Sequence, residues 1–146
     1  MAISGSDEID IKATPAAVMA TLEDFASYPE WSSAHKKASV ETTDDAGRPQ
    51  RVRMTMQMVG ITDEQVVDYS FDGNEKMSWS LVESSQQKSQ EGTYTLTDNG
   101  DGTTHVTFEL ALDIKIKVPG FLLNKAKKGA LETATKSLKK RVESQA

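Results

Sequence analysis

Apolar and polar residues alternate along most of the chain between residues 38 and 116, a period of two that is typical of β-strands with one buried face. In the clearest stretch, single polar residues separate Val106, Phe108 and Leu110. Short segments rich in Asp, Asn and Gly interrupt the alternation and have the composition of tight turns. These segments are residues 44–47, 60–63, 72–74 and 98–102. The pattern predicts about six strands joined as hairpins, which form an antiparallel meander with one apolar face.

One short strand and two short helices are predicted before the meander. The alternation at residues 9–11 predicts a brief strand. Thr14 and Pro15 form a helix-start signal, because Thr caps the first turn and Pro is tolerated at the first helical position. Apolar residues then recur at helical spacing for about three turns, at Val18, Leu22 and Phe25. Residues 24–31 interrupt this helix, since Pro29 disfavours a helical conformation at the residue before it, and a second short helix is expected near Trp31.

A long helix is expected after Pro119, ending near Val142. Its apolar residues share one arc of the helical wheel: Leu123, Ala126, Ala130, Leu131, Ala134, Leu138 and Val142. Lys127 and Arg141 also fall within this arc. Because an apolar sheet face must be covered and only this helix is long enough, we expect the sheet to curl around it. The expected fold is α+β, with one domain over residues 1–146.

The side chains that face each other across this fold differ in size. The centre of the helix offers mainly alanines, whereas the inner face of the sheet offers methionines and aromatic residues. Since protein interiors pack densely, a gap beside short side chains favours a ligand pocket. The alternative is that the large residues of the sheet fill the gap themselves.

Several short motifs together carry a family resemblance. They are residues 14–18 (TPAAV), 24–25 (DF), 28–31 (YPEW), 92–94 (GTY), 102–104 (GTT), 118–121 (VPGF) and 138–143 (LKKRVE). With these motifs the chain resembles the polyketide cyclase/dehydrase and lipid-transport family of the START-like (SRPBCC) helix-grip superfamily. The resemblance covers nearly the whole chain and implies a seven-stranded antiparallel sheet that grips the last helix around an apolar pocket. Members of this family include aromatase/cyclases and carriers of lipids or quinones, so the fold alone does not decide the function.

The candidate ligand-binding residues lie on the inner face of the sheet and along the pocket side of the last helix. They are Met54, Met56, Met58, Tyr69, Phe71, Trp79, Tyr94, Phe108, Leu110, Phe121, Ala126, Lys127 and Ala130. The methionines suit an adaptable binding surface, although core packing explains them equally well. Tyr69 and Tyr94 could orient a ligand oxygen or bond to the backbone. Lys127 could meet an anionic group at the pocket mouth or extend into water. Phe121 could gate the entrance or pack against the first helices.

Catalytic and metal-binding chemistry has little support in the sequence. The absence of cysteine excludes a disulfide scaffold, a thiolate metal site and a cysteine nucleophile. No phosphate loop, dinucleotide fingerprint or metal motif is present, so neither a cofactor nor a metal is expected. His105 is expected to face outward and His35 to have a structural role, and neither lies in a nucleophile motif. We therefore predict no catalytic residue.

The net charge of −5 is unevenly distributed along the chain. Residues 1–114 carry 8 Lys and Arg against 20 Asp and Glu, whereas residues 115–146 carry 9 against 2. The acidic body would repel phosphate, so we expect no nucleic-acid partner and interpret the basic segment as matched to its own body. No apolar run could insert stably in a membrane and no signal peptide is visible, so a cytoplasmic location is expected.

The leading functional hypothesis is binding or carriage of a hydrophobic small molecule in a cavity between the sheet and the last helix. A lipid, a quinone or a polyketide-like compound would suit such a site. The first alternative is a polyketide cyclase or dehydratase in which Tyr69 or Tyr94 donates a proton or a hydrogen bond. The second alternative is an interaction module that uses the basic face of the helix.

Overall fold

Seven antiparallel strands form one sheet in the computed structural model, which describes residues 2–145. The strands are β1 (Ala2–Ile11), β2 (His35–Thr43), β3 (Pro49–Met58), β4 (Ile61–Asp72), β5 (Lys76–Ser84), β6 (Gln87–Asp98) and β7 (Thr104–Ile114). Strands β2 to β7 pair in chain order, and β1 pairs with β7 at the edge. The predicted meander of six hairpin-linked strands is confirmed.

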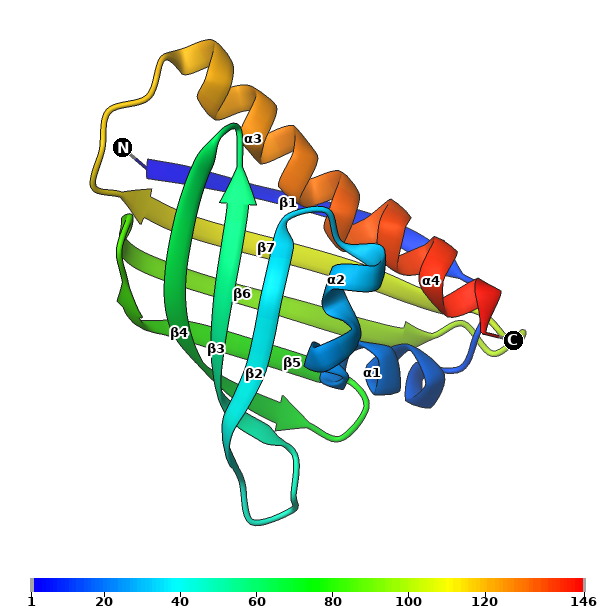
Figure 1. Ribbon diagram of the computed structural model, residues 1–146. Helices are drawn as coiled ribbons and strands as arrows, with labels where there is room; N and C mark the ends of the chain where they lie inside the picture. The colour runs from blue at the N-terminus through cyan, green and yellow to red at the C-terminus, as the bar shows by residue number, and fades with distance from the viewer. Residues whose placement is uncertain (1, 146) are drawn as a thin grey trace.

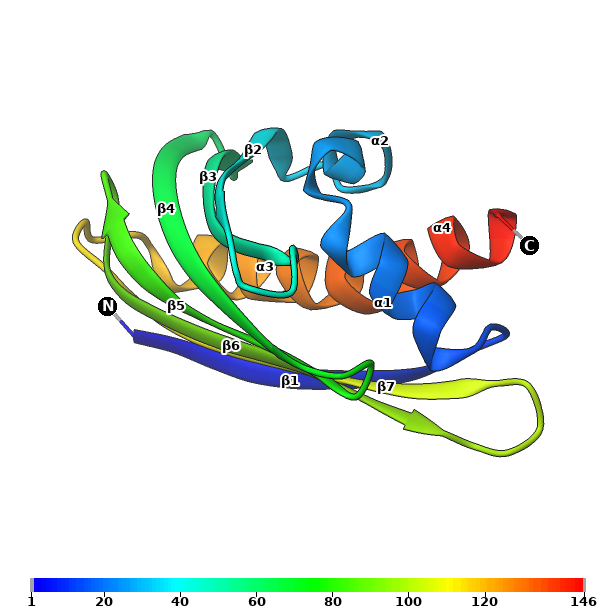
Figure 2. The same cartoon turned by 90° about the horizontal axis from the view of Figure 1, so that it is seen from below.

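The helices gather on the concave side of the curved sheet (Figure 1, Figure 2). They are α1 (Pro15–Glu23), the 3-10 helix η1 (Phe25–Ser27), α2 (Tyr28–Trp31), α3 (Gly120–Glu132), the π-helical turn η2 (Thr133–Ser137) and α4 (Leu138–Ser144). The last three form one long helix that runs across the sheet, while α1 and α2 cover one end of it. This arrangement confirms the expected α+β helix-grip fold.

The start of α1 follows the sequence signal closely. The Thr14 hydroxyl accepts a hydrogen bond from the amide of Ala17 at 3.2 Å, and Pro15 occupies the first helical position. The short helix α2 ends at Trp31, as expected. The predicted helix-start and second-helix signals are thus both confirmed.

Strand β1 is longer than predicted, since the expected strand covered only residues 9–11. Its inward positions include Gly5 and Asp7, which break the apolar alternation. Asp7 is accommodated because the Thr135 hydroxyl donates a hydrogen bond to its carboxylate at 2.9 Å. A polar contact with the last helix therefore takes the place of apolar packing at this point of the strand.

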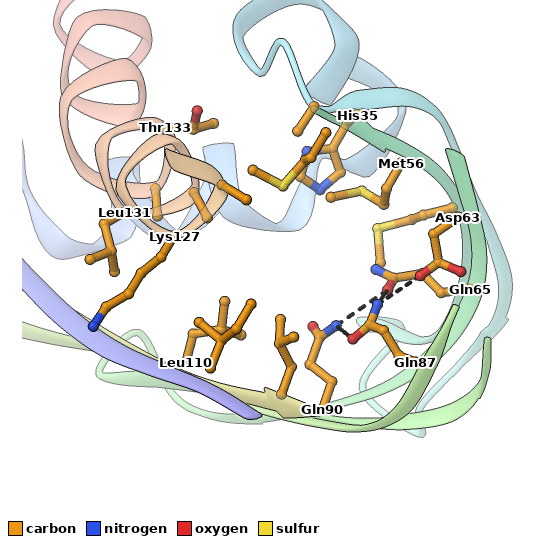
Figure 3. Close-up of a pocket in the computed structure, with 18 of the residues that line it drawn as sticks. His35, Met56, Asp63, Gln65, Gln87, Gln90, Leu110, Lys127, Leu131 and Thr133 are labelled. Carbon is orange, nitrogen blue, oxygen red and sulfur yellow. Dashed lines mark hydrogen bonds between the residues drawn. The ribbon is translucent and has the colours of Figure 1, made fainter. Parts of the chain in front are cut away.

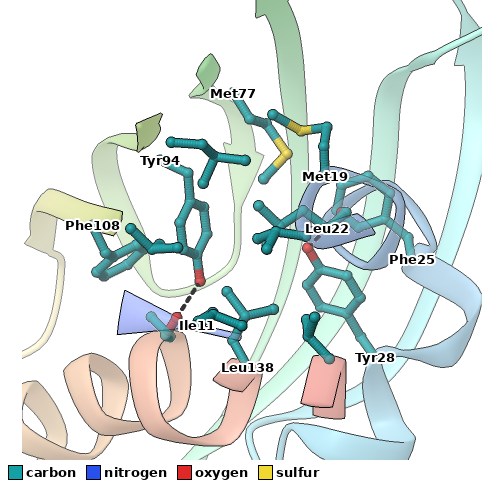
Figure 4. Close-up of a cluster of buried hydrophobic side chains, with 14 of the residues drawn as sticks. Ile11, Met19, Leu22, Phe25, Tyr28, Met77, Tyr94, Phe108 and Leu138 are labelled. Atoms are coloured by element: carbon teal, nitrogen blue, oxygen red, sulfur yellow. Dashed lines mark hydrogen bonds between the residues drawn. The ribbon is translucent and has the colours of Figure 1, made fainter. Parts of the chain in front are cut away.

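The two halves of the last helix differ in burial. None of the residues Gly120–Glu132 of α3 is fully buried, whereas η2 and α4 bury Ala134, Thr135, Leu138 and Val142. Figure 4 shows Leu138 packed into a cluster with Ile11 and side chains of α1. The hydrophobic core therefore lies beside the C-terminal half of the helix.

Part of the basic segment contacts the acidic body. Arg141 forms an ion pair with Glu30 at 3.2 Å. Lys139 pairs with Glu143 at 2.8 Å and donates a hydrogen bond to the carbonyl of Asp10 at 2.7 Å. Within residues 2–145, no helix combines the length and the apolar character needed to cross a membrane.

Candidate ligand-binding pocket

A pocket of about 230 Å³ lies between the concave face of the sheet and the α3 half of the last helix (Figure 3). The short side chains of Ala126 and Ala130 line it on the helix side, and large side chains of the sheet line the other walls. Protein interiors normally pack without such space. The volume is far beyond what one water molecule occupies, so it can accommodate an organic molecule.

Most of the predicted candidate residues line this pocket. They are Met54, Met56, Met58, Tyr69, Trp79, Tyr94, Phe108, Leu110, Ala126, Lys127 and Ala130. The sheet residues come from the neighbouring strands β3 to β7, where alternate side chains point to the same face. The period-two pattern therefore brings them to one surface.

Phe71 and Phe121 lie outside the pocket, so the prediction that they line it is wrong. Phe71 stands near the end of β4, where its ring packs against the hydrophobic core and under the guanidinium of Arg48 at 4.2 Å. Phe121 lies in the first turn of α3 and is 74% exposed, because it falls outside the apolar arc of the helix. Because the ring of Phe121 is exposed, the expectation that it packs against the first helices is wrong, whereas the entrance-gate role stays a prediction.

One end of the pocket is polar. The side-chain amide of Gln87 donates hydrogen bonds to Oδ2 of Asp63 at 2.7 Å and to Oε1 of Gln65 at 2.8 Å. The amide of Gln90 donates to Oε1 of Gln87 at 2.7 Å and to Oε1 of Gln65 at 3.3 Å. Figure 3 shows these four side chains together at one side of the open space. They form a continuous network in an otherwise mainly apolar pocket.

Trp79 lies flat across Gly92 on the neighbouring strand. A Cβ atom at position 92 would stand 2.1 Å from the indole ring, so only glycine leaves room for it. The indole N–H donates a hydrogen bond to Oε1 of Gln90 at 2.9 Å, which joins the aromatic wall to the polar end. Trp79 is thereby held as a rigid part of the pocket wall.

The two pocket tyrosines differ in their hydrogen bonding. The hydroxyl of Tyr94 donates a hydrogen bond to the carbonyl of Ala134 at 2.8 Å. Of the two roles expected for Tyr94, orienting a ligand oxygen or bonding to the backbone, it therefore takes the second. The hydroxyl of Tyr69 has no hydrogen-bond partner among the described residues, and burial raises the pKa of Tyr69 above its ordinary value. Tyr69 therefore leaves a polar group available in the pocket wall.

His35 also lines the pocket. Its Nδ1 lies 2.5 Å from the hydroxyl of Ser32, and its ring packs edge-on against Tyr28 with 4.9 Å between centroids. Burial lowers the pKa of His35 to about 4, because the charged imidazolium loses its hydration. The imidazole is thus neutral at pH 7.

Lys127 crosses the pocket rim over strand β1. Its Cε would lie 2.7 Å from a Cβ at position 5, so the glycine there makes room for the lysine side chain. Figure 3 shows the ammonium group at the β1 side, across the open space from Gln65. The cation and the polar network therefore occupy opposite sides of the pocket.

His105 lies on the outer face of β7, away from the pocket, as expected. Its Nδ1 lies 2.8 Å from Oδ1 of Asp10, and this hydrogen bond raises the pKa of His105. Within the described part of the chain, no group of three or more His, Asp or Glu side chains could hold a metal ion.

Comparison with models of known protein families shows which family the chain belongs to. The family model described as polyketide cyclase/dehydrase and lipid transport matches residues 2–143. The chain belongs to this polyketide cyclase/dehydrase and lipid-transport family. The resemblance found in the sequence motifs is thereby confirmed for the family.

Solved structures share the family fold at low sequence identity. A START superfamily protein from Mycobacterium smegmatis has 22% identity and a TM-score of 0.88, with 98% of this chain and 99% of that chain covered. The Zhui aromatase/cyclase from Streptomyces sp. R1128 has 9% identity and a TM-score of 0.82, with 98% and 94% covered. A protein from Thermus thermophilus has 21% identity and a TM-score of 0.81, with 99% of both chains covered. No curated protein matches the sequence.

The sequence patterns did not point to the polar end of this family member's pocket. Residues 60–63 were expected to form a turn, but the turn consists of Val59 and Gly60, with φ angles of 44° and 80°, and β4 begins at Ile61. Asp63 and Gln65 therefore take inward positions on a strand. Extending the alternation of Val67 and Tyr69 by two and four residues would have placed Gln65 and Asp63 inward, but the turn predicted at residues 60–63 left Asp63 outside the strand.

Proposed function

We propose that this chain binds or carries a hydrophobic small molecule, such as a lipid, a quinone or a polyketide-like compound, in the pocket beneath α3. The observation that carries the proposal is an unfilled apolar space that ends in a small polar network. Ligand sites commonly combine an apolar lining with a few convergent polar groups. Membership in a family named for cyclases and lipid transport supports the same class of ligand.

The pocket is suited to binding by apolar contact. Methionines at positions 54, 56 and 58 form a flexible wall on β3, and Trp79 and Phe108 form a rigid wall on β5 and β7. A ligand that fills the space removes apolar surface from water on both partners, which contributes about 25 cal/mol for each Å² buried. Shape and polar groups would then select among apolar ligands.

Intrinsic fluorescence gives a direct test, because both tryptophans of the chain, Trp31 and Trp79, line the pocket. Titration with fatty acids, quinones and aromatic polyketides should change the emission in a saturable manner. Native mass spectrometry after mild purification should detect the complex as a mass increase. A protein that shows neither response with any of these compounds would refute the proposal.

A pocket-filling variant supplies the specificity control. Ala130→Leu adds a branched side chain on the helix side of the pocket and should abolish binding while the protein stays folded. Ala46→Leu makes the same change in an exposed turn and should leave binding unchanged. Equal binding by the two variants would show that the ligand sits elsewhere.

The cyclase alternative depends on Tyr69, the one of its two proposed donors whose hydroxyl has no partner among the described residues. The hydroxyl of Tyr94 donates a hydrogen bond to the carbonyl of Ala134, and a pKa of about 4 makes His35 a weak base at neutral pH. Lys139 and Arg141 on the basic segment make ion pairs within the chain, which uses part of the charge that the interaction-module alternative requires. We therefore retain ligand binding as the proposed function.

A further inference from the structure

At the polar end of the pocket, the side-chain nitrogen of Gln65 has no hydrogen-bond partner among the described residues. Gln65 is only 4% exposed, and its Oε1 accepts hydrogen bonds from Gln87 and Gln90. Its Nε2 makes no hydrogen bond within residues 2–145, and Figure 3 shows this nitrogen directed toward the open space. Because this N–H group faces a mainly apolar pocket without an acceptor, a ligand that brings an acceptor to this position would be favoured.

The neighbouring groups determine which end of the Gln65 amide faces the pocket. Asp63 acts only as an acceptor, so Gln87 must turn its nitrogen toward Asp63 and Gln65. The indole of Trp79 only donates, so Gln90 must turn its oxygen toward Trp79 and its nitrogen toward Gln65. Both neighbours therefore present N–H groups to Gln65. Its oxygen faces them, and its nitrogen faces the pocket.

The charge at this end of the pocket restricts the acceptor further. The carboxylate of Asp63 accepts hydrogen bonds from Ser84, Ser85, Gln87 and the amide of Gln86, all of which are uncharged. No ion pair of the described residues involves Asp63. A ligand carboxylate would bring a second negative charge close to this unbalanced one, where little water screens the repulsion. A neutral oxygen avoids that cost.

We propose that Gln65 selects ligands that carry a neutral carbonyl oxygen, as in a ketone, a quinone or an ester, on an apolar body. This inference rests on the proposed function and names the ligand class of the same pocket. The apolar body lies beneath Ala126 and Ala130, and the carbonyl oxygen accepts a hydrogen bond from Nε2 of Gln65. Lys127, the cation that would attract a carboxylate, lies on the opposite side of the pocket.

Three ligands of similar shape test this selectivity: 2-acetylnaphthalene, 2-isopropylnaphthalene and 2-naphthoate. Isothermal titration calorimetry at pH 7.5 should show the ketone binding roughly tenfold more tightly than the hydrocarbon, as expected for one well-placed hydrogen bond. The naphthoate should bind more weakly than the ketone. Gln65→Met keeps the length of the side chain but removes the donor, so it should abolish the preference for the ketone while hydrocarbon binding persists.

Matched variants identify the donor. Gln57→Met makes the same change at an exposed position of β3 and should retain the full preference. Tyr69→Phe removes a rival donor of the pocket wall, a hydroxyl without a partner among the described residues, and should also retain the preference. Loss of the preference in Tyr69→Phe but not in Gln65→Met would overturn the assignment. Tighter binding of naphthoate than of the ketone, lost in Lys127→Met, would overturn the ligand class.

A measurement on the unaltered protein guards against misfolding of the Gln65 variant. With a ¹³C-labelled carbonyl, the resonance of bound 2-acetylnaphthalene should move downfield, and one side-chain amide signal of the protein should shift with the ketone but not with the hydrocarbon. Absence of both shifts in a saturated complex would refute the hydrogen bond. Equal binding of ketone and hydrocarbon would refute the selectivity alone, whereas no binding of any of the three would count against the proposed function.

Discussion

Acidification should destabilise the protein through His35, a residue that the fold keeps uncharged. Burial lowers the pKa of His35 to about 4 from 6.5. The unfolded chain therefore binds more protons than the folded protein between these two values, and the free energy of unfolding falls as the pH falls through this window. The slope is about 1.4 kcal/mol per pH unit, so the loss between pH 6.5 and 5 is about 2 kcal/mol.

Other titrating groups act outside this window. The pKa of His105 is raised by its hydrogen bond to Asp10, so its stabilisation is complete below pH 6.5 and is lost only as the pH rises through the folded value. Hydrogen bonds lower the pKa values of Asp10, Asp68 and Glu143, whose stabilisation is therefore lost only at more acidic pH. The interval from pH 5 to 6.5 thus isolates His35.

Urea unfolding at half-unit steps of pH, followed by tryptophan fluorescence, measures this slope. The His35→Gln variant cannot be protonated, so its stability should be nearly constant between pH 5 and 6.5. His105→Gln should keep the wild-type slope in this interval and differ from the wild type only at higher pH. The reasoning would be refuted by identical slopes in the wild type and His35→Gln, or by an NMR titration that gives His35 an ordinary pKa.

Three further substitutions and one control substitution test the packing of the pocket and core by urea unfolding. Gly92→Ala forces the Trp79 ring to move and should lower the free energy of unfolding by about 1–3 kcal/mol. In the control Gly120→Ala, the added methyl group meets no neighbouring atom, so the stability should be unchanged or slightly higher. Equal effects of the two substitutions would contradict the close contact between Gly92 and Trp79. Leu138→Ala, in the fully buried half of the last helix, should cost about 2–5 kcal/mol, and a loss below 1 kcal/mol would contradict its core position. Tyr94→Phe removes the hydrogen bond to the helix backbone and should lower the free energy of unfolding by about 1 kcal/mol. Unchanged stability would contradict this contribution.

The architecture was accessible from the sequence because each element carries a strong local signal. The alternation around Phe108 persists over a whole strand, and Thr14 with Pro15 fixes the start of α1. The inward aromatic residues followed from the same alternation, which places Trp79 and Tyr94 on the concave face. Long strands with one apolar face leave little freedom in register, since a shift of one residue would expose every apolar side chain.

The polar end of the pocket required tertiary information. Gln65 and Gln87 belong to strands that are not neighbours in the sheet, and they meet because β5 ends at Ser84 and the turn that follows packs against Asp63. A glutamine on the inner face looks the same in the sequence as one on the outer face, such as Gln57. Phe121 shows the opposite error, because an apolar residue beside the helix start suggests burial that the orientation of α3 does not provide.

The division of the last helix explains how one element can serve both stability and binding. Its C-terminal half fills the core with Leu138 and Val142, while its N-terminal half presents alanines to the pocket. The π-helical turn between them is held to the sheet at two points, by Tyr94 bound to Ala134 and by Thr135 bound to Asp7. Because these contacts fix the helix at the junction, the α3 half can remain above an unfilled space without collapsing onto the sheet. Changes in α3 should therefore alter ligand binding more than stability.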